Sequence, residues 1–428
     1  MRNNKKLLFL LPVLLLSSCN FKYAYVIEGL EIEGNMEEID DGIDDAGSYE
    51  IKIWVDDKLV DLTKMQIQSF VSASNNKYTI DVKVEPVSEG SAASSMLQDV
   101  QSGADIFCFA QDQLARLKVA GAIAKLTGTY ATFIESNNSA DSVKAASIGD
   151  NIYAFPITSD NGYFLYYDKS IISEDDAKDM TKILARCKAT GKKLNFEARG
   201  NGFYTASYFL ATGCYSNWEL DAETGKFKDF DDNIASEKGL IAAKGLQELD
   251  DTATVAGNSL ASKLGDTAAA VVSGVWEYEV AEKRLGENLG CAEMPSFTVD
   301  GKSYHLGSFD GYKLLGVKPQ VDAKKASVCR KLARYLTSEE CQTQRFKEVS
   351  WGPTNKKSSE RKEVLDHPGL AALIKQHEYA TQQSQCPGAW FVALATAATA
   401  IKKTSTDAEI QATLDLYSKG LKELLDED

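Results

Sequence analysis

Two apolar, β-favouring runs in the middle of the chain constrain the fold more than any other feature. Residues 152–157 and 163–167 are rich in aromatic and apolar side chains, and the polar run 158–162 separates them. Asn161-Gly162 favours the type I′ turn of a β-hairpin. The same pattern suits a strand that leaves one lobe, passes through a short polar hinge and enters a second lobe. Local chemistry leaves both interpretations open.

Residues 1–19 have the pattern of a secretory signal. Three of the first six residues are basic, and the apolar run 7–16 is too short to span a membrane as a mature helix. The ending Leu16-Ser17-Ser18-Cys19 resembles a bacterial lipobox, in which Cys19 is acylated and becomes the new N-terminus. A plain secretory signal with an incidental cysteine is the alternative. Because two acyl chains anchor stably, we expect a lipid-anchored protein on the extracytoplasmic face of the cell membrane.

An acidic segment follows the signal. Residues 28–45 contain nine Asp and Glu residues and no Lys or Arg. Such a block repels itself and has too few large apolar residues to fold alone. Its spacing does not match a calcium-binding loop, which has a central Gly and a terminal Glu. We therefore predict that residues 20–49 form a solvated tether.

The size and charge of the remaining chain limit its function. About 380 residues are too many for one ordinary core and predict two lobes. The formal net charge of -15 and the lack of a basic patch argue against a nucleic-acid partner. Seven cysteines remain after Cys19, so at least one stays unpaired. No Cys-x-x-Cys pair occurs and the chain has three His residues, so we expect neither a metal site nor a cofactor.

Strands and helices alternate along the chain. The strands predicted in the first half are residues 51–55, 78–84 and 105–109, and the helices are residues 61–74, 91–103 and 114–120. In the second half the helices are residues 176–189, 202–212, 323–337 and several within 369–425, and the strands are 193–196 and 268–272. Residues 294–312 predict a second crossing, back to the first lobe. Alternation predicts parallel sheets covered on both faces, with ligands beyond the carboxyl ends of the strands. Residues 55–57 and 109–112 then lie at a binding edge.

Several short motifs occur in a recognisable order. They are Ile51-Lys52-Ile53-Trp54, Gly103-Ala104-Asp105-Ile106-Phe107, residues 120–126, Tyr153-Ala154-Phe155-Pro156, Tyr167-Asp168-Lys169 and the run 269–276 that ends at Trp276. With the lipobox, they resemble the family 1 extracellular solute-binding proteins, which include the maltose-binding proteins of ABC importers. The resemblance covers nearly all of residues 50–425.

The resemblance implies an α/β, periplasmic-binding-protein-like fold with two lobes, a hinge and a ligand cleft between them. It implies an N-terminal lobe of residues 50–159 and 307–355 and a C-terminal lobe of residues 160–306 and 356–428. A chain that crosses between lobes more than once favours the hinge over the hairpin. The second hinge is expected near residues 307–310.

Catalytic motifs are missing. The chain has no Gly-x-Ser-x-Gly, no Gly-x-x-x-x-Gly-Lys-Ser/Thr and no His-Glu-x-x-His. Carboxylates are numerous, so counting does not exclude a glycosidase pair, but the resemblance supplies none. We therefore expect a binding protein and not an enzyme.

A sugar site needs aromatic faces for the ring and polar groups for its hydroxyls. The positions that match the family's binding loops are Phe109, Gln111, Asp112, Asp160, Glu197, Arg199, Tyr204, Trp276, Asp310 and Trp390. Trp276 and Trp390 align with aromatic residues that stack on sugar in the maltose-binding branch. Small residues precede both tryptophans, which predicts one uncovered ring face on each. Core packing is the alternative for any of these aromatics. The chain departs from the maltose-binding pattern at Phe109, where Trp is usual, and at Gln113, where Arg is usual, so maltose itself is not implied.

The function predicted from the resemblance is capture of a carbohydrate, most simply an oligosaccharide, for the membrane-embedded permease subunits of an ABC importer. We expect a monomer. A polyamine receptor, which would use carboxylates and aromatic walls, and a surface adhesin on the same fold are the alternatives. An iron receptor is disfavoured, because the adjacent Tyr166 and Tyr167 of one strand point to opposite faces.

Overall fold

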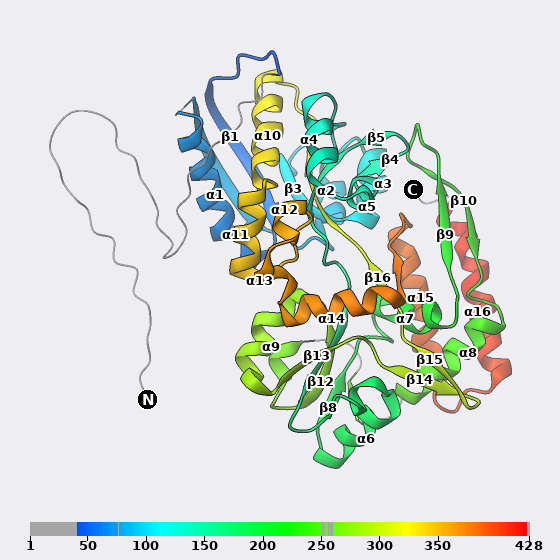
Figure 1. Cartoon of the computed structure of the whole chain (residues 1–428). Coiled ribbons are helices and arrows are strands. Elements are labelled where there is room, and N and C mark those ends of the chain that lie inside the picture. The colour runs from blue at the N-terminus through cyan, green and yellow to red at the C-terminus, as the bar shows by residue number, and fades with distance from the viewer. Residues whose placement is uncertain (1–40, 76, 250–252, 256–259, 426–428) are drawn as a thin grey trace.

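The computed structural model describes residues 41–75, 77–249, 253–255 and 260–425. In this part of the chain, two lobes each form around a five-stranded sheet, one above the other in Figure 1. The predicted two-lobed α/β fold is confirmed. The predicted signal peptide, Cys19 and most of the tether lie outside the described residues.

The upper lobe in Figure 1, here the N-lobe, has the sheet order β2-β1-β3-β17-β6. Its strands are β1 (Gly47–Val55), β2 (Tyr78–Pro86), β3 (Ile106–Ala110), β6 (Ala154–Thr158) and β17 (Lys313–Val317). β1 runs parallel to β2 and β3, whereas β17 runs antiparallel to β3 and β6. The carboxyl ends of β1, β3 and β6 therefore share one edge of the sheet with Lys313, the first residue of β17.

Helices cover both faces of this sheet, because successive strand residues point to opposite sides. Ile51 and Ile53 belong to the core that α1 (Val60–Ala73), α10 (Ala323–Leu336) and α11 (Glu339–Val349) complete. Trp54 belongs to the core on the side of α2 (Ala92–Gln98) and α3 (Leu114–Val119). α2 ends before the predicted residue 103, since Asp99 accepts hydrogen bonds from the backbone N–H groups of the next residues instead of continuing the helix.

The lower lobe, here the C-lobe, has the sheet order β11-β8-β12-β7-β13. Its strands are β7 (Phe164–Asp168), β8 (Lys193–Asn195), β11 (Thr254–Val255), β12 (Ala268–Ser273) and β13 (Leu289–Ala292). β8 runs parallel to β11 and β12, and β7 runs antiparallel to β12 and β13. The first residue of β7, Phe164, pairs with the last residue of β12, Ser273. Helices α6 (Met180–Thr190), α9 (Tyr278–Leu285) and α14 (Pro368–Gln376) pack against this lobe.

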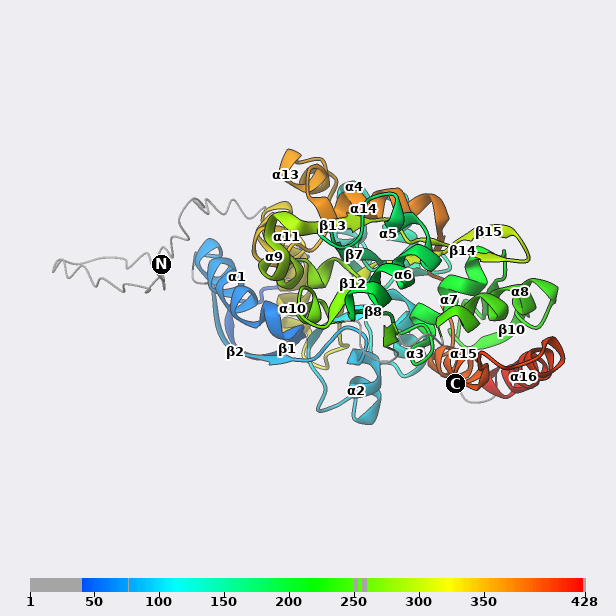
Figure 2. The ribbon, with the colours of Figure 1, turned by 90° about the horizontal axis from the view of Figure 1, so that it is seen from below.

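A separate helical layer extends the C-lobe at one end of the molecule (Figure 2). It consists of α7 (Gly202–Ala211), α8 (Glu237–Leu246), α15 (Gly388–Ala400) and α16 (Asp407–Gly420). Two antiparallel hairpins that the sequence did not predict lie beside it, β9–β10 (Ser216–Leu220, Phe227–Asp232) and β14–β15 (Ser296–Val299, Lys302–His305). Further elements are α4 (Thr129–Asn137), α5 (Ala140–Ala145), β4 (Ser147–Ile148), β5 (Asn151–Ile152), α12 (Lys356–Ser359) and α13 (Lys362–Leu365).

The chain crosses between the lobes three times. β6 and β7 lie in different sheets, so the hinge interpretation of residues 158–162 is confirmed and the hairpin is excluded. The second crossing contains β16 (Ser308–Asp310), which pairs in parallel with β18 (Ala380–Gln382) before the chain enters β17. The third crossing lies between α11, which packs against α1 of the N-lobe, and α14, which packs against β13 and β7 of the C-lobe.

The described end of the acidic segment is bound to the N-lobe. Asp45 is fully buried and lies 2.8 Å from the ammonium groups of both Lys331 and Lys77. Burial acts to raise the pKa of Asp45, but hydrogen bonds from Lys331, Lys77 and Ser327 outweigh it and hold the pKa well below its usual range. Asp41 also pairs with Lys331, at 3.1 Å. Residues 41–45, expected to be part of a solvated tether, thus attach to the lobe that follows.

Candidate functional site

The carboxyl-end edges of the two sheets face each other across the first crossing. The chain leaves the N-lobe sheet at the carboxyl end of β6 and enters β7 beside the carboxyl end of β12. Short helical turns follow the parallel strands at these edges: Asp57–Leu59 after β1, Gln111–Gln113 after β3 and Val275–Glu277 after β12. Ligands of such sheets bind beyond these strand ends. The surface between the lobes is therefore the candidate site.

One direct contact joins these edges. Lys58, in the turn after β1, donates a hydrogen bond from Nζ to the backbone carbonyl of Trp276 at 2.6 Å. The Trp276 side chain is half-buried, and the Nζ of Lys313 lies 5.1 Å from its ring centroid. A Cβ added at Gly274 would overlap the indole of Trp276. Gly274 is therefore part of the surface against which the ring packs, and the half-buried ring keeps part of its surface exposed.

Asp160 lies where the three crossings meet. Its side chain is fully buried, and Oδ1 accepts hydrogen bonds from Thr158 Oγ1 at 2.6 Å and from Lys313 Nζ at 3.2 Å. Oδ2 accepts one from the backbone N–H of Gly352 at 2.7 Å. The three donors belong to the first, second and third crossings respectively. The structure thus places Asp160 inside the hinge, with both carboxylate oxygens already hydrogen-bonded within the protein.

A second contact region joins the turn after β3 to the segment between β18 and α15. Gln383 Nε2 donates to Asp112 Oδ1 at 2.9 Å, and Gln385 Nε2 donates to the carbonyl of Gln111 at 2.6 Å. Gln385 Oε1 accepts from the backbone N–H of Ala115 at 3.0 Å. Burial raises the pKa of Asp112 to about 6. Two predicted site residues, Gln111 and Asp112, therefore lie together at the interlobe surface, in contact with glutamines that the sequence analysis did not single out.

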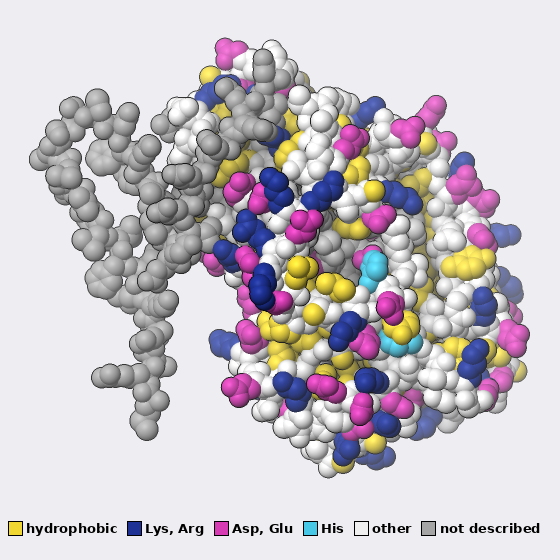
Figure 3. Space-filling view, viewed as in Figure 1, with side chains coloured by type: hydrophobic (Ala, Val, Ile, Leu, Met, Phe, Trp, Pro, Cys, Tyr) yellow, Lys and Arg dark blue, Asp and Glu magenta, His cyan; other side chains and the backbone are white. Residues whose placement is uncertain are grey.

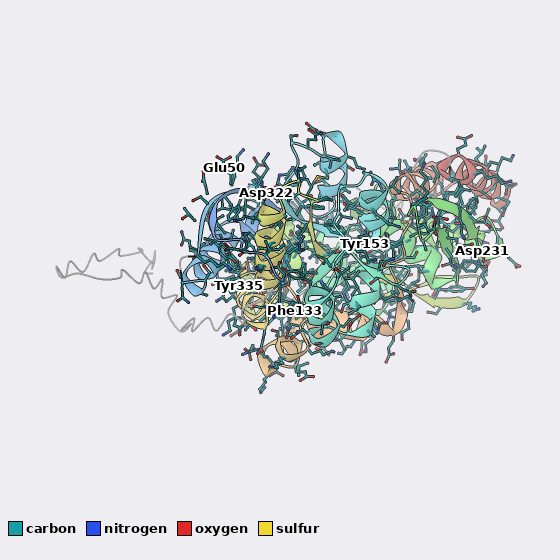
Figure 4. The ribbon with its side chains drawn as sticks, turned by 90° about the horizontal axis from the view of Figure 1, so that it is seen from above. Glu50, Phe133, Tyr153, Asp231, Asp322 and Tyr335 are labelled. Carbon is teal, nitrogen blue, oxygen red and sulfur yellow. The ribbon has the colours of Figure 1, made fainter. Side chains whose placement is uncertain are left out.

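The hairpin β9–β10 provides a third contact region. Lys118 of α3 donates hydrogen bonds to the carbonyls of Ala222 and Glu223 at 2.7 and 2.8 Å. Its ammonium also lies 5.7 Å from the ring centroid of Tyr153, which is labelled near the middle of Figure 4. The two lobes therefore contact each other at several places along their boundary.

A cavity lies between α7, β9, α15 and the segment 381–386. Phe309, Trp390 and Phe391 contribute aromatic surface, and Asn217 and Gln383 contribute amide groups. Aromatic faces beside a few polar groups are the composition that sugar sites use. Gln383 connects this cavity with the N-lobe, through its bond to Asp112.

Trp390 has a defined structural environment. Its ring is buried, and the indole N–H donates to Tyr417 Oη at 2.8 Å. Tyr417 in turn donates to Asp232 at 2.9 Å. Gly388, two residues before Trp390, is itself packed, because a Cβ there would lie 2.7 Å from Arg116 Nη1. At Trp390, as at Trp276, the small neighbour accommodates a protein side chain.

The other predicted site residues occupy varied surroundings. Phe109 is fully buried in the N-lobe core, 5.5 Å from Phe107 between ring centroids. Tyr204 is buried against Tyr163, 5.0 Å away. Asp310 lies 3.1 Å from His377 Nδ1, and burial raises the pKa of its carboxyl group.

Arg199 is buried within the C-lobe. Its guanidinium donates to the carbonyls of Ala398 at 2.9 Å, Leu246 at 2.8 Å and Ile401. These carbonyls belong to the carboxyl ends of α15 and α8, where helices leave acceptors unsatisfied. Glu197, two residues before Arg199, is half-buried. Its carboxylate accepts a hydrogen bond from the side-chain amide of Asn201 at 3.4 Å. The structure does not bring Arg199 together with the N-lobe residues of the candidate site.

Residues outside the predicted set also contribute to this surface. Lys58 and Lys313 bind groups across the lobe boundary, and Lys58 directly follows the predicted edge 55–57. Glu89 is buried near the same edge, and its Oε1 has no hydrogen-bond partner among the described residues. Burial raises the pKa of Glu89 to about 7, and the charge of Lys313 opposes this rise.

Three general properties of the described chain bear on its expected function: surface charge, metal binding and membrane-spanning helices. On the face drawn in Figure 3, Lys and Arg side chains are interspersed with Asp and Glu over both lobes. In residues 41–425, apart from the short undescribed gaps, no group of three or more His, Cys, Asp or Glu residues is arranged to hold a metal ion. No helix in that same part of the chain is long and apolar enough to cross a lipid bilayer.

Comparisons with known proteins match this architecture. A family model described as bacterial extracellular solute-binding protein matches residues 67–372. No curated protein sequence matches the chain. A protein solved with acarbose is 28% identical, with a TM-score of 0.75 over 88% of this chain and 100% of its own.

Two further structures show the same fold at lower identity. The maltodextrin-binding protein MalE1 from L. casei BL23, solved without ligand, is 22% identical, with a TM-score of 0.73 over 88% of this chain and 99% of its own. MalX from Streptococcus pneumoniae, solved with maltopentaose, is 15% identical, with a TM-score of 0.70 over 87% of this chain and 99% of its own.

Proposed function

Because the chain belongs to the family of bacterial extracellular solute-binding proteins, we propose that it captures a carbohydrate between its two lobes and delivers it to an ABC importer. The observation that carries the proposal is the meeting of aromatic and polar side chains at the lobe boundary. Trp276 lies there beside Lys58, and Asp112 and Gln383 lie beside a cavity lined by Trp390. The similar proteins solved with acarbose and maltopentaose support an oligosaccharide as the ligand.

The binding step is non-covalent. Sugar rings would stack on the half-buried aromatic surface of Trp276, where apolar ring faces are removed from water. Hydroxyl groups would bond to Asp112 from the N-lobe and to residues of the C-lobe, so that one ligand bridges both lobes. A ligand that binds the closed arrangement more tightly than the open one shifts the population toward closure. No reaction of the sugar is required.

The hinge gives this closure a defined axis. The three crossings meet at Asp160, which is held by one donor from each crossing. A few residues at strand ends can absorb the change in backbone dihedral angles. Among the predicted site residues, we therefore assign Asp160 to the hinge and Arg199 to C-lobe structure. Phe109 and Tyr204, both buried, support the walls of the site rather than line it.

The location follows from the sequence of the first residues. We propose that Cys19 is acylated and anchors the mature protein to the extracytoplasmic face of the cell membrane, as a monomer near its permease partner. The bound end of the acidic segment at Asp45 supports this arrangement, because a chain fixed to the N-lobe leaves the lobe at a defined place.

A thermal-shift screen tests the proposed ligand class. The panel consists of maltose, maltotriose, maltotetraose, maltopentaose and acarbose, with spermidine and divalent metal ions as the alternatives. A ligand present at a hundred times its dissociation constant stabilises the native state by about 2.7 kcal/mol. The melting temperature of a chain of this size then rises by about 3 °C. A shift with an oligosaccharide supports the proposal, whereas a shift with spermidine alone would replace it with a polyamine receptor.

A further inference from the structure

One ammonium group contacts both lobes and all three crossings. Lys313 begins β17, and its side chain is 4% exposed. Its Nζ lies 3.2 Å from Asp160 Oδ1 in the first crossing and 3.7 Å from the ring centroid of Trp351 in the third. The same Nζ lies 5.1 Å from the ring centroid of Trp276, which the C-lobe carries. Lys313 itself belongs to the end of the second crossing.

Trp276 is fixed from both lobes. Within the C-lobe, Tyr166 Oη donates to the carbonyl of Gly274 at 2.9 Å and holds the turn that carries the ring. The side chain nevertheless packs against the N-lobe core that contains Trp351, and Lys58 of the N-lobe binds the Trp276 carbonyl. A C-lobe aromatic ring thus completes an N-lobe surface.

The two tryptophans are suited to a buried cation. An ammonium over an indole face is attracted by the ring quadrupole, more strongly than over Phe or Tyr and most when water is excluded. The Trp351 indole N–H has no hydrogen-bond partner among the described residues, so hydrogen bonding does not account for a tryptophan at this position. Asp160 supplies the opposite charge that a buried ammonium needs.

We propose that Lys313 is the positioning residue for Trp276: it sets the ring at the interlobe surface and couples its position to the hinge. The role of Trp276 as a ligand contact rests on the proposed function, whereas the coupling to the hinge does not. A ring set before the ligand arrives lowers the entropy cost of binding. The contact also holds the two lobes together at this side of the boundary.

The first test measures the ligand-free protein. Lys313→Met removes the cation, and Lys313→Met/Asp160→Asn removes both charges so that no buried carboxylate is left without its partner. We expect a larger radius of gyration in small-angle scattering for the folded double variant than for Asp160→Asn alone. We also expect a red shift of the Trp276 emission, taken as the difference from the same protein with Trp276→Phe. Lys313→Arg keeps the cation, so the radius of gyration and the Trp276 emission of this variant should equal those of the unaltered protein.

Two comparisons make this test specific. Lys302 lies over Tyr304 at 5.0 Å within the C-lobe hairpin, so Lys302→Met removes a cation–π contact that does not cross the boundary. It should change neither the radius of gyration nor the Trp276 emission. In the background Trp276→Leu, removing the Lys313 charge should have no further effect on the radius of gyration. Unchanged scattering in the double variant, or an equal effect in the Trp276→Leu background, would overturn the proposal.

The second test uses maltotetraose as the probe. We expect its affinity for Lys313→Met/Asp160→Asn to be about tenfold lower than for Asp160→Asn, with recovery in Lys313→Arg. Equal affinity of the double variant and the single variant Asp160→Asn would overturn the positioning role. If the unaltered protein does not bind maltotetraose or any other oligosaccharide, the proposed function fails, and the ligand-free measurements still decide the coupling to the hinge.

Discussion

Replacement of Arg199 by Met separates the structural role of this residue from a role in ligand binding. The substitution leaves the buried carbonyls of Ala398, Ile401 and Leu246 without their donor. An unsatisfied buried acceptor costs about 1–3 kcal/mol, and water and local relaxation reduce the sum over three acceptors. We expect a loss of about 3 kcal/mol in the free energy of unfolding, because the ends of α8 and α15 lose a shared donor.

Urea unfolding of the variant measures this loss, and calorimetric titration with the oligosaccharide identified in the thermal-shift screen measures affinity. The affinity of the folded fraction should not change, since the guanidinium lies inside the C-lobe. Arg186→Met is the matched control, because Arg186 pairs with Asp176 at 2.8 Å on the surface and such pairs contribute about 0–1 kcal/mol. A marked loss of affinity in a protein of unchanged stability would refute the reasoning and return Arg199 to the ligand site.

Three further predictions concern the aromatic surface, a buried acid and the anchor. Trp276→Leu should weaken oligosaccharide binding by about 1–3 kcal/mol, roughly ten-fold to over a hundred-fold in the dissociation constant. The melting temperature should change little, because the ring is only half-buried. Calorimetric titration and thermal unfolding of the same sample show whether affinity falls while stability is kept. Glu89 has a folded-state pKa raised to about 7 from an ordinary value of 4.5, so the native state retains the proton longer than the unfolded state. The stability that Glu89 contributes is fully present below pH 4.5 and is lost as the pH rises toward 7. The loss amounts to about 3 kcal/mol in the free energy of unfolding. Glu89→Gln should abolish this pH dependence, and urea unfolding at pH 4.5 and at pH 7 measures it. Cys19→Ala should release the protein from the membrane fraction or leave its precursor unprocessed, and unchanged fractionation with normal processing would exclude lipidation at this residue.

The sequence predicted the fold where local patterns were strong. The β-favouring runs on both sides of residues 158–162, with strand–helix alternation before and after them, identified the crossing and part of each sheet. The predicted parallel sheets are wrong, because β17 and β7 run antiparallel to their neighbours, and β11, β13 and β17 were not predicted. The hairpin β9–β10 was missed because its strands are largely polar and its burial is partial. The helix 91–103 was predicted too long because the side chain of Asp99 offers the backbone an alternative to the helix.

The candidate site was harder to predict, because neighbours in space determine it. Arg199 has the residue type of a ligand contact, yet its three acceptors are 47, 199 and 202 residues away in the chain. Gly274 and Gly388 were interpreted as leaving a ring face uncovered, but the indole of Trp276 packs against Gly274 and the guanidinium of Arg116 lies against Gly388. Gln383 and Gln385 carry no motif, and only the path of the chain between β18 and α15 brings them to Asp112 and Ala115.

A crystal structure of the protein with the oligosaccharide that gives the largest thermal shift tests the central claim most directly. The account predicts electron density for the sugar between the lobes, with a ring against Trp276 and hydroxyl contacts to Asp112 on the N-lobe. Both lobes should contact the same ligand, and the three crossings should still meet at Asp160. Sugar density confined to the outer surface of one lobe, with the boundary between the lobes unoccupied, would contradict capture between the lobes.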